Sequence, residues 1–200
     1  IGGLPDVIRA CKVKKLYSPV DEFEAKPFET MKRAADDKKL KITVPQAGQS
    51  FSLGRAKVVF LAPLGIYDNV NDLSLVVRIT YGQTAFLFTG DASSKVESEL
   101  IASHAELSCD ILKAGHHGSR YSTSADFLRA TNPGLIIFSC GLDNSYSHPS
   151  ESTLERVRRA GVDYFRTDYN GTITVDAKEL VASCEKGKIT SPAGRLKAAA

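Results

Sequence analysis

Three short apolar runs between residues 84 and 139 each end in a polar turn that precedes a helical pattern. The runs are residues 84–89, 110–113 and 135–139. The turns after them carry an aspartate, a histidine pair and a third histidine: Asp91, His116, His117 and His148. Strands that alternate with helices in this way form layered α/β proteins, whose active-site residues lie in the loops beyond strand ends. This feature therefore restricts the fold class and suggests an enzyme.

The first half predicts a helix near Pro5, a second helix, and then antiparallel strands. Residues 27–38 place Phe28, Met31 and Ala34 at helical spacing. Strands are expected at 15–18, 40–44, 51–53, 56–61 and 75–80, the last paired with 84–89 in a hairpin. The second half predicts helices at about 93–105, 124–130 and 150–160, and strands at 162–166 and 172–175. We expect one domain over residues 1–178 and an extension or tail over residues 179–200.

Composition and charge are those of an ordinary globular protein. The 200 residues are 42% hydrophobic and 24% charged, which is enough to bury a core. The net charge of +3 permits a polyanionic ligand without requiring one. No apolar run approaches the roughly 18–20 residues that span a bilayer, and no secretion signal is recognisable. The four cysteines form no Cys-x-x-Cys pair, so free thiols are expected and disulfides stay open.

Asp91 follows the strand that ends at Thr89 and precedes a helix. One interpretation is structural, because an aspartate in that position can cap the helix by binding backbone N–H groups. The other is chemical, because Asp oxygens bind divalent metal ions at roughly 2.0–2.2 Å.

The segment Gly115–Ser119 reads Gly-His-His-Gly-Ser and is the strongest single motif. One histidine could be a buried core residue, but two at a strand end indicate a metal or hydrolytic site. Neighbours on an extended backbone point in opposite directions, so one of His116 and His117 is expected to face the metal or substrate and the other to orient a ligand. Gly118 allows close backbone approach. Ser119 could contact a phosphate or cap the next helix, and no Gly-x-Ser-x-Gly elbow marks it as a nucleophile.

Weaker candidates lie in other loops. His148 follows the strand 135–139 and either contributes an imidazole or simply begins a helix within His-Pro-Ser. Asn71 belongs to the polar segment 69–74 that enters a strand. Arg166 either contacts an anion or forms a structural salt bridge.

The order of these motifs resembles the metallo-β-lactamase superfamily. Within it, the chain is most similar to the hydrolase domain attached to ComEC/Rec2 DNA-uptake channels and to its free-standing relatives. The matching segments are Gly2–Pro5, Asn71–Ser74, Phe88–Asp91, Leu112–Ser119, Asn144–Pro149 and Arg166–Gly171. The resemblance covers nearly the whole chain to about Val175.

The resemblance implies a four-layer αββα sandwich, N-terminally truncated here, with a metal site at one edge between the sheets. It also implies one or two divalent ions, zinc first and manganese second, that lower the pKa of a bound water for attack on a phosphodiester or other ester or amide bond. By position, the expected metal ligands are Asp91, His116 and His148. His117 and His148 are the expected catalytic residues, and the choice among the three histidines stays open. The expected substrate contacts are Ser119, Asn71 and Arg166.

The principal metal motif of the family, His-x-His-x-Asp-His, is missing. It normally stands immediately before the Gly-Gly-Leu-Pro run, which here occupies Gly2–Pro5. Segment 69–74 also lacks a histidine that many members have in that region. Zinc sites usually need at least three protein ligands, so the residues present are compatible with a single weak site and not with a dinuclear one. The sequence is then either a piece of a longer hydrolase or a naturally shortened, inactive module.

The first functional hypothesis is a metal-dependent hydrolase, phosphodiesterase- or nuclease-like, with DNA or another phosphodiester as substrate. The alternative is a non-catalytic module that binds nucleic acid or anions through Arg120, Arg166 and the Gly118–Ser119 turn. Hydrolysis of a β-lactam or thioester is a third reading, because the fold supports many reactions. The expected compartment is extracytoplasmic if the chain is attached to a ComEC-like channel, and otherwise it is a soluble cytoplasmic or secreted protein.

Overall fold

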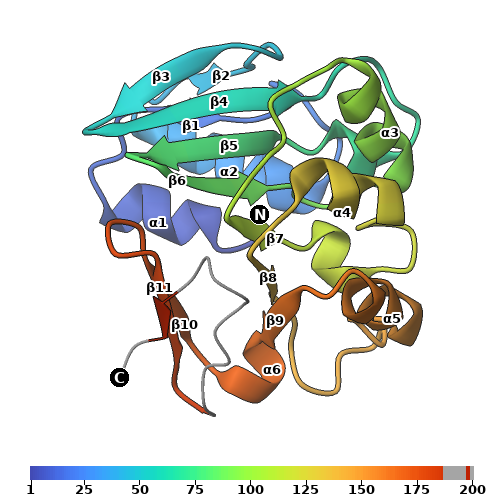
Figure 1. Ribbon diagram of the computed structural model, residues 1–200. Helices are drawn as coiled ribbons and strands as arrows, with labels where there is room; N and C mark the ends of the chain where they lie inside the picture. Colours follow the sequence, from blue (N-terminus) through green and yellow to red (C-terminus); the bar gives the residue numbers. More distant parts are fainter. Residues whose placement is uncertain (187–196, 199–200) are drawn as a thin grey trace. The chain divides into compact units, whose positions relative to one another are not determined.

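The chain forms two units, residues 1–46 and 47–200, in the computed structural model, which describes residues 1–186 and 197–198 (Figure 1). The first unit contains the helices α1 (Leu4–Ala10) and α2 (Lys26–Asp37) and a parallel pair of two-residue strands, β1 (Leu16–Tyr17) and β2 (Ile42–Thr43). Its core residues are Ile8, Leu16, Phe28, Met31, Ala34 and Ala35. The predicted apolar face of α2 is thus confirmed, whereas the strand predicted over 40–44 is only two residues long.

The second unit is organised by a seven-stranded mixed sheet with its strands in sequence order, β3 to β9. Its strands are β3 (Ser50–Leu53), β4 (Ala56–Ala62), β5 (Val76–Tyr81), β6 (Thr84–Phe88), β7 (Ile111–Lys113), β8 (Leu135–Phe138) and β9 (Asp163–Arg166). Strands β3 to β6 are antiparallel, and β6 to β9 are parallel. The change of direction at β6 follows the predicted change from hairpins to strand–helix units.

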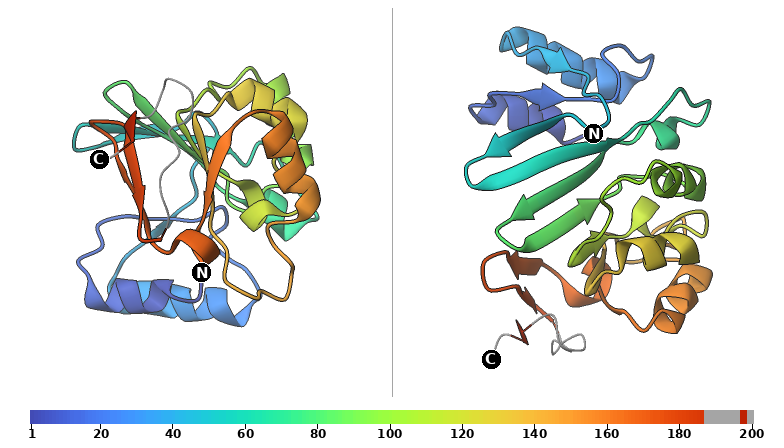
Figure 2. Two further views of the ribbon diagram at one scale, coloured as in Figure 1. Left: turned by 60° about the horizontal axis from the view of Figure 1, so that its bottom comes forward. Right: turned by 45° about the horizontal axis from the view of Figure 1, so that its top comes forward.

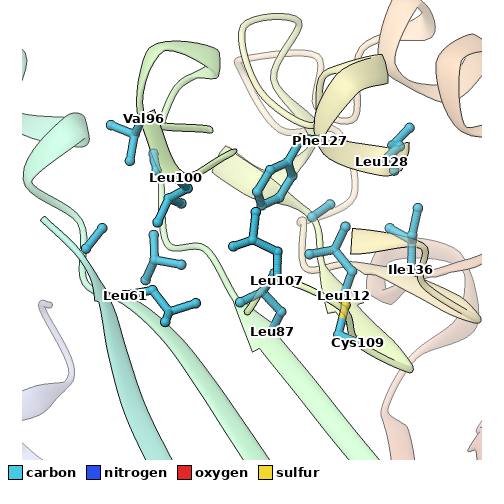
Figure 3. Close-up of a cluster of buried hydrophobic side chains, with 14 of the residues drawn as sticks. Leu61, Leu87, Val96, Leu100, Leu107, Cys109, Leu112, Phe127, Leu128 and Ile136 are labelled. Carbon is cyan, nitrogen blue, oxygen red and sulfur yellow. The ribbon is translucent and has the colours of Figure 1, made fainter. Parts of the chain in front are cut away.

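Three helices cover one face of this sheet (Figure 2). They are α3 (Ser94–Ala102), α4 (Ala125–Thr131) and α5 (Glu151–Arg159). The main core lies between these helices and the sheet, where Leu87 and Leu112 from the strands meet Leu100 and Phe127 from the helices (Figure 3). A serine side chain caps the first turn of each helix: Ser93, Ser124 and Ser150.

A small second sheet covers the other face of β7 to β9. It consists of β10 (Ile173–Asp176), β11 (Val181–Cys184) and β12 (Lys197–Ala198). Ala182 of β11 belongs to the same buried cluster as Ile111 and Leu135 of the main sheet. The unit therefore has a helical layer, a large sheet and a small sheet, which confirms the predicted α/β class.

The predicted boundary between residues 178 and 179 remains a prediction. Strand β11 lies beyond that boundary and pairs with β10. Most of the predicted tail, residues 187–196 and 199–200, lies outside the described residues. In the part of the chain that the structure describes, no helix has the length and apolar character needed to cross a membrane.

The parallel strands determine where the site can form. Because β6 to β9 run in one direction, the loops that follow them emerge at one edge of the sheet. Asp91, the histidine pair, His148 and Arg166 all belong to that set of strand ends and loops.

Candidate functional site

The candidate site is formed by the loops after β6, β7 and β8. The first loop carries Asp91, and the second is a short turn, η2 (Gly115–Gly118), that contains both adjacent histidines. Backbone hydrogen bonds join the loops: the His116 N–H donates to the Gly90 carbonyl at 2.9 Å, and the Ser150 N–H donates to the Gly118 carbonyl at 2.9 Å. Main-chain contacts therefore fix the relative positions of the three loops.

The centre of the site is a contact between Asp91 and His117. Asp91 Oδ1 lies 3.4 Å from His117 Nε2, and both side chains are partly exposed. The other ring nitrogen, His117 Nδ1, lies 2.6 Å from the Ser139 carbonyl oxygen. A carbonyl only accepts hydrogen bonds, so Nδ1 carries the proton and a neutral ring directs the Nε2 lone pair toward the carboxylate. Two electron-pair donors facing each other require a positive charge, either a second proton or a metal ion.

The rings of His116 and His148 lie beside this pair. The ring centroid of His116 is 6.3 Å from that of His117 and 5.6 Å from that of His148. His148 Nδ1 is buried and, among the described residues, has no hydrogen-bond partner. Burial, and then the positive charges that His116 and His117 can carry, lower the pKa of His148. His148 therefore has an unused buried nitrogen, and its lowered pKa favours the neutral imidazole, the form that binds metal ions.

The backbone of the histidine pair differs from the extended conformation assumed in the sequence argument. His116 has φ 45° and His117 has φ 56°, so both lie in the left-handed region. This conformation is uncommon outside glycine and costs on the order of 1–3 kcal/mol per residue. The expectation that neighbouring rings point in opposite directions therefore does not apply, and the two imidazoles are arranged edge to face.

The residues present fit a metal ion in part. Bonds of ~2.0–2.2 Å place two ligands of one tetrahedral zinc ion about 3.3–3.6 Å apart, and the Asp91–His117 separation of 3.4 Å matches that spacing. Over residues 1–186 and 197–198, however, no group of three or more His, Cys, Asp or Glu side chains is close enough to hold one ion. The site thus places two potential ligands, Asp91 and His117, at a suitable spacing, and the ligand assignments remain predictions.

Asp91 is not the cap of helix α3. That position belongs to Ser93, whose side chain accepts the Lys95 N–H, so the structural interpretation of Asp91 is wrong. Instead, the polar segment 69–74 holds the Asp91 loop from the side. The Ser74 hydroxyl oxygen accepts the Asp91 N–H at 2.9 Å, and the buried Asp72 carboxylate accepts the Ser93 N–H at 3.0 Å.

Asn71 lies in η1 (Val70–Leu73), within that same polar segment. Its backbone N–H donates to the side-chain oxygen of Asn69 at 3.1 Å. Its carbonyl oxygen accepts the N–H of Ser74, the residue whose hydroxyl binds the Asp91 N–H, so Asn71 helps to shape the segment that holds the Asp91 loop. The expected substrate contact of Asn71 stays a prediction.

The other two expected substrate contacts are already engaged with protein groups. Ser119 is 3% exposed, and its hydroxyl oxygen accepts the Tyr121 N–H at 3.4 Å. It does not cap the next helix, because the α4 cap is Ser124. Arg166 forms a two-point salt bridge with Asp168 at 3.1 and 2.6 Å. The salt-bridge interpretation of Arg166 is therefore confirmed, and substrate contact by either residue stays a prediction.

Sequence reasoning did not assign a role to Lys113. Its ammonium group lies 3.5 Å from the Gly90 carbonyl oxygen, next to the Asp91 loop. Burial lowers the pKa of Lys113, whereas the charge of Asp91 raises it. A lysine at the end of an otherwise apolar strand, Ile111–Lys113, is the sequence signal that could have identified it.

A second missed feature is the network that holds the loop after the histidine pair. The buried Glu97 carboxylate accepts the N–H groups of Thr123 and Ser124. Arg156 donates to the Thr123 carbonyl at 3.1 Å and to the Ser122 carbonyl at 2.8 Å. Burial raises the pKa of Glu97, against the effect of the backbone N–H groups that it binds.

Comparison with known proteins identifies relatives of this chain. The family model described as metallo-beta-lactamase superfamily matches residues 1–141. ComE operon protein 3 of Bacillus subtilis is 29% identical over 184 residues, which cover 92% of this chain and 24% of that protein. Competence protein ComA of Neisseria gonorrhoeae is 39% identical over 104 residues, which cover 52% of this chain and 15% of that protein. The chain thus spans less than a quarter of the length of these curated relatives.

Among solved structures, the metallo-β-lactamase fold protein YhfI from Bacillus subtilis is similar at 14% identity, with a TM-score of 0.42. The match covers 64% of this chain and 53% of YhfI. The family match spans most of the chain and includes Asp91 and the histidine pair. The chain belongs to the metallo-β-lactamase superfamily and is similar to proteins of the ComEC type.

Proposed function

We propose that this chain contributes to the active site of a metal-dependent phosphodiester hydrolase. The observation that supports this most directly is the Asp91–His117 contact, in which a carboxylate oxygen and an imidazole nitrogen face each other at 3.4 Å. The Ser139 carbonyl oxygen orients the imidazole through its other nitrogen, as outer-shell partners do for metal-binding histidines.

Asp91 and His117 would hold the metal ion, and His148 and His116 are the nearest further imidazoles. A divalent ion bound there supplies Lewis acidity and a hydrolytic nucleophile at neutral pH. Zinc suits the mixed carboxylate and imidazole donors, and manganese is the second choice. Burial and the charges that the neighbouring imidazoles can carry lower the pKa of His148, which favours the neutral ring that can bind a cation or accept a proton.

The surroundings suit an anionic substrate. Lys113 and Arg120 provide positive charge on either side of the histidine pair in the sequence, and Arg120 is exposed. A phosphodiester is the substrate class that combines a hydrolysable bond with a negative charge. One relative is named a competence protein, and we extend that association to DNA as the proposed substrate.

The test is hydrolysis of bis(p-nitrophenyl) phosphate by the purified protein before chelation, after chelation, and after return of zinc or manganese. Asp91→Asn keeps the side-chain shape and removes the charge, so activity should fall at least about 100-fold, beyond the loss typical of outer-shell partners. His104→Ala is the matched control, because His104 is the one histidine remote from the motif loops and lies in a turn after α3. Unchanged activity in Asp91→Asn would contradict the assignment.

A non-catalytic anion-binding module remains the second candidate. The absence of a three-ligand group among the described residues favours it. Such a module would bind DNA with an affinity that falls steeply as salt rises, and would hydrolyse nothing with any added metal. Measuring binding and hydrolysis in the same salt series separates the two functions.

A further inference from the structure

A pocket of about 330 Å³ opens beside His116, His117 and His148, which we call the histidine cluster, on the side of the loop after β8. Its lining includes His117 and His148, together with Cys140, Asn144 and Tyr146. A volume above roughly 300 Å³ is in the range of small-ligand sites. Because His117 both lines the pocket and contacts Asp91, the pocket adjoins the Asp91–His117 contact, and it has room for part of a substrate.

Tyr146 is the unusual member of this lining. It is 79% exposed, although its ring lies against His148 with a centroid separation of 5.8 Å and an angle of 27° between the planes. The contact with His148 supports one side of the phenol ring, while most of the side chain faces solvent. An exposed aromatic ring that is supported from behind is a surface on which a second flat ring can stack.

The turn that carries Tyr146 is built by Asn144. The Asn144 side-chain amide donates to the His148 carbonyl at 2.6 Å and to the Gly141 carbonyl at 3.0 Å. The Asn144 side-chain oxygen accepts the His148 N–H at 2.9 Å. The position of Tyr146 is therefore fixed by hydrogen bonds to the same residue, His148, that belongs to the histidine cluster.

Arg120 adds positive charge near His148, the ring that Tyr146 contacts. Besides burial and the two neighbouring imidazoles, the Arg120 guanidinium is close enough to lower the pKa of His148. A flat ring and a nearby cation are the two elements that proteins use for unpaired nucleotides, one for the base and the other for the phosphate. Bases inside a duplex have their faces covered by their neighbours, so stacking on this tyrosine requires an unpaired base.

Resting on the proposed function, we infer that Tyr146 is a stacking platform for a nucleobase, and that the substrate is a single-stranded polynucleotide. The base lies on Tyr146, and the adjacent phosphodiester lies toward His117 and Asp91. A substrate without bases would lose the contribution of Tyr146 and keep that of the charges.

The test uses a labelled single-stranded deoxyoligonucleotide and an abasic chain with the same number of phosphates, both in buffer with EDTA. Fluorescence anisotropy should show that Tyr146→Ala weakens binding of the base-bearing strand at least about fivefold, the lower limit for loss of one stacked base. Its affinity for the abasic chain should not change. Tyr81→Ala is the matched control, because Tyr81 ends β5 at the edge of the sheet opposite the site.

A direct readout is available because the chain contains no tryptophan. Tyr146→Trp keeps a stacking ring and introduces a single reporter, whose fluorescence should be quenched by the base-bearing strand and not by the abasic one. Tyr81→Trp should respond to neither. Equal affinity of the two strands for the native protein, or unchanged binding in Tyr146→Ala, would overturn the inference. The proposed hydrolase function is tested separately on bis(p-nitrophenyl) phosphate, so it can stand when this inference fails.

Discussion

Replacing Gly118 by alanine should destabilise the protein by about 2–5 kcal/mol. Gly118 has φ +91°, and an added Cβ would lie 2.4 Å from Pro149 Cβ and 2.8 Å from Phe138 Cδ1. Alanine held in this left-handed backbone conformation, which glycine adopts freely, costs about 1–2 kcal/mol. Forcing a methyl group into a packed interior costs about 1–3 kcal/mol more. Pro149 and Phe138 are both buried, so neither can move aside without disturbing the core.

Equilibrium urea denaturation measures this cost, and Gly82→Ala provides the control. Gly82 has φ +60°, but nothing lies within 4 Å of its Cβ position, so it should cost only the backbone part, about 1–2 kcal/mol. The difference between the two variants isolates the steric part, about 1–3 kcal/mol. Because Gly118 follows the histidine pair, zinc affinity should also fall in Gly118→Ala alone. If both variants lower the free energy of unfolding equally, the close packing of Gly118 against Pro149 and Phe138 is not present.

Further predictions concern burial and charge. Glu97→Ala should cost about 3–5 kcal/mol in urea denaturation, because it leaves the buried N–H groups of Thr123 and Ser124 without their acceptor and removes the negative charge that acts on Arg156. Glu155→Ala on the surface should cost under about 1 kcal/mol. Equal costs for the two variants would refute the buried network. Burial raises the pKa of the Cys109 thiol to about 12, so iodoacetamide at pH 8 should modify Cys11 in the folded protein and Cys109 only after unfolding, as mass spectrometry of the peptides can establish. The pKa of His148 is lowered in the folded state, so the unfolded state binds this proton more readily; stability of the metal-free protein should be full above about pH 6.5 and decline below it. His148→Asn should reduce that decline, and an unchanged pH dependence in the variant would contradict the assigned environment.

Local patterns in the sequence predicted most of the fold because they report burial directly. The apolar spacing of Phe28, Met31 and Ala34 predicts helix α2, and the apolar runs at β7 and β8 predict strands buried on both faces. Strand β11, Val181–Cys184, was missed because it depends on pairing with β10 and on the cover it gives the main sheet. Tertiary contacts, rather than the pattern of the segment itself, make it a strand.

The site was predictable in its residues but not in its geometry. The motif order brought Asp91, the histidine pair and His148 together as candidates, because loops after parallel strands meet at one edge. Which imidazole faces Asp91 could not be predicted, because it depends on the left-handed backbone of the pair and on a hydrogen bond to Ser139, a residue on another strand end. A dipeptide does not contain that information, and only the packed loops supply it.

The support around the site was likewise invisible in the sequence. Glu97 and Asp72 look like ordinary surface acids in their segments, and each proves to be buried with backbone N–H groups as partners. Tyr146 looks like an ordinary loop residue, and its contact with His148 depends on the turn that Asn144 closes.

The most direct test of the proposed metal site is a calorimetric zinc titration of the chelator-treated protein. If Asp91 and His117 hold the metal, zinc binding should be saturable and should weaken at least about tenfold in Asp91→Asn and in His117→Asn, because each variant removes one of the two facing ligands. His104→Asn should bind zinc like the native protein. Native zinc affinity in both Asp91→Asn and His117→Asn would contradict the central claim that these two side chains hold the metal.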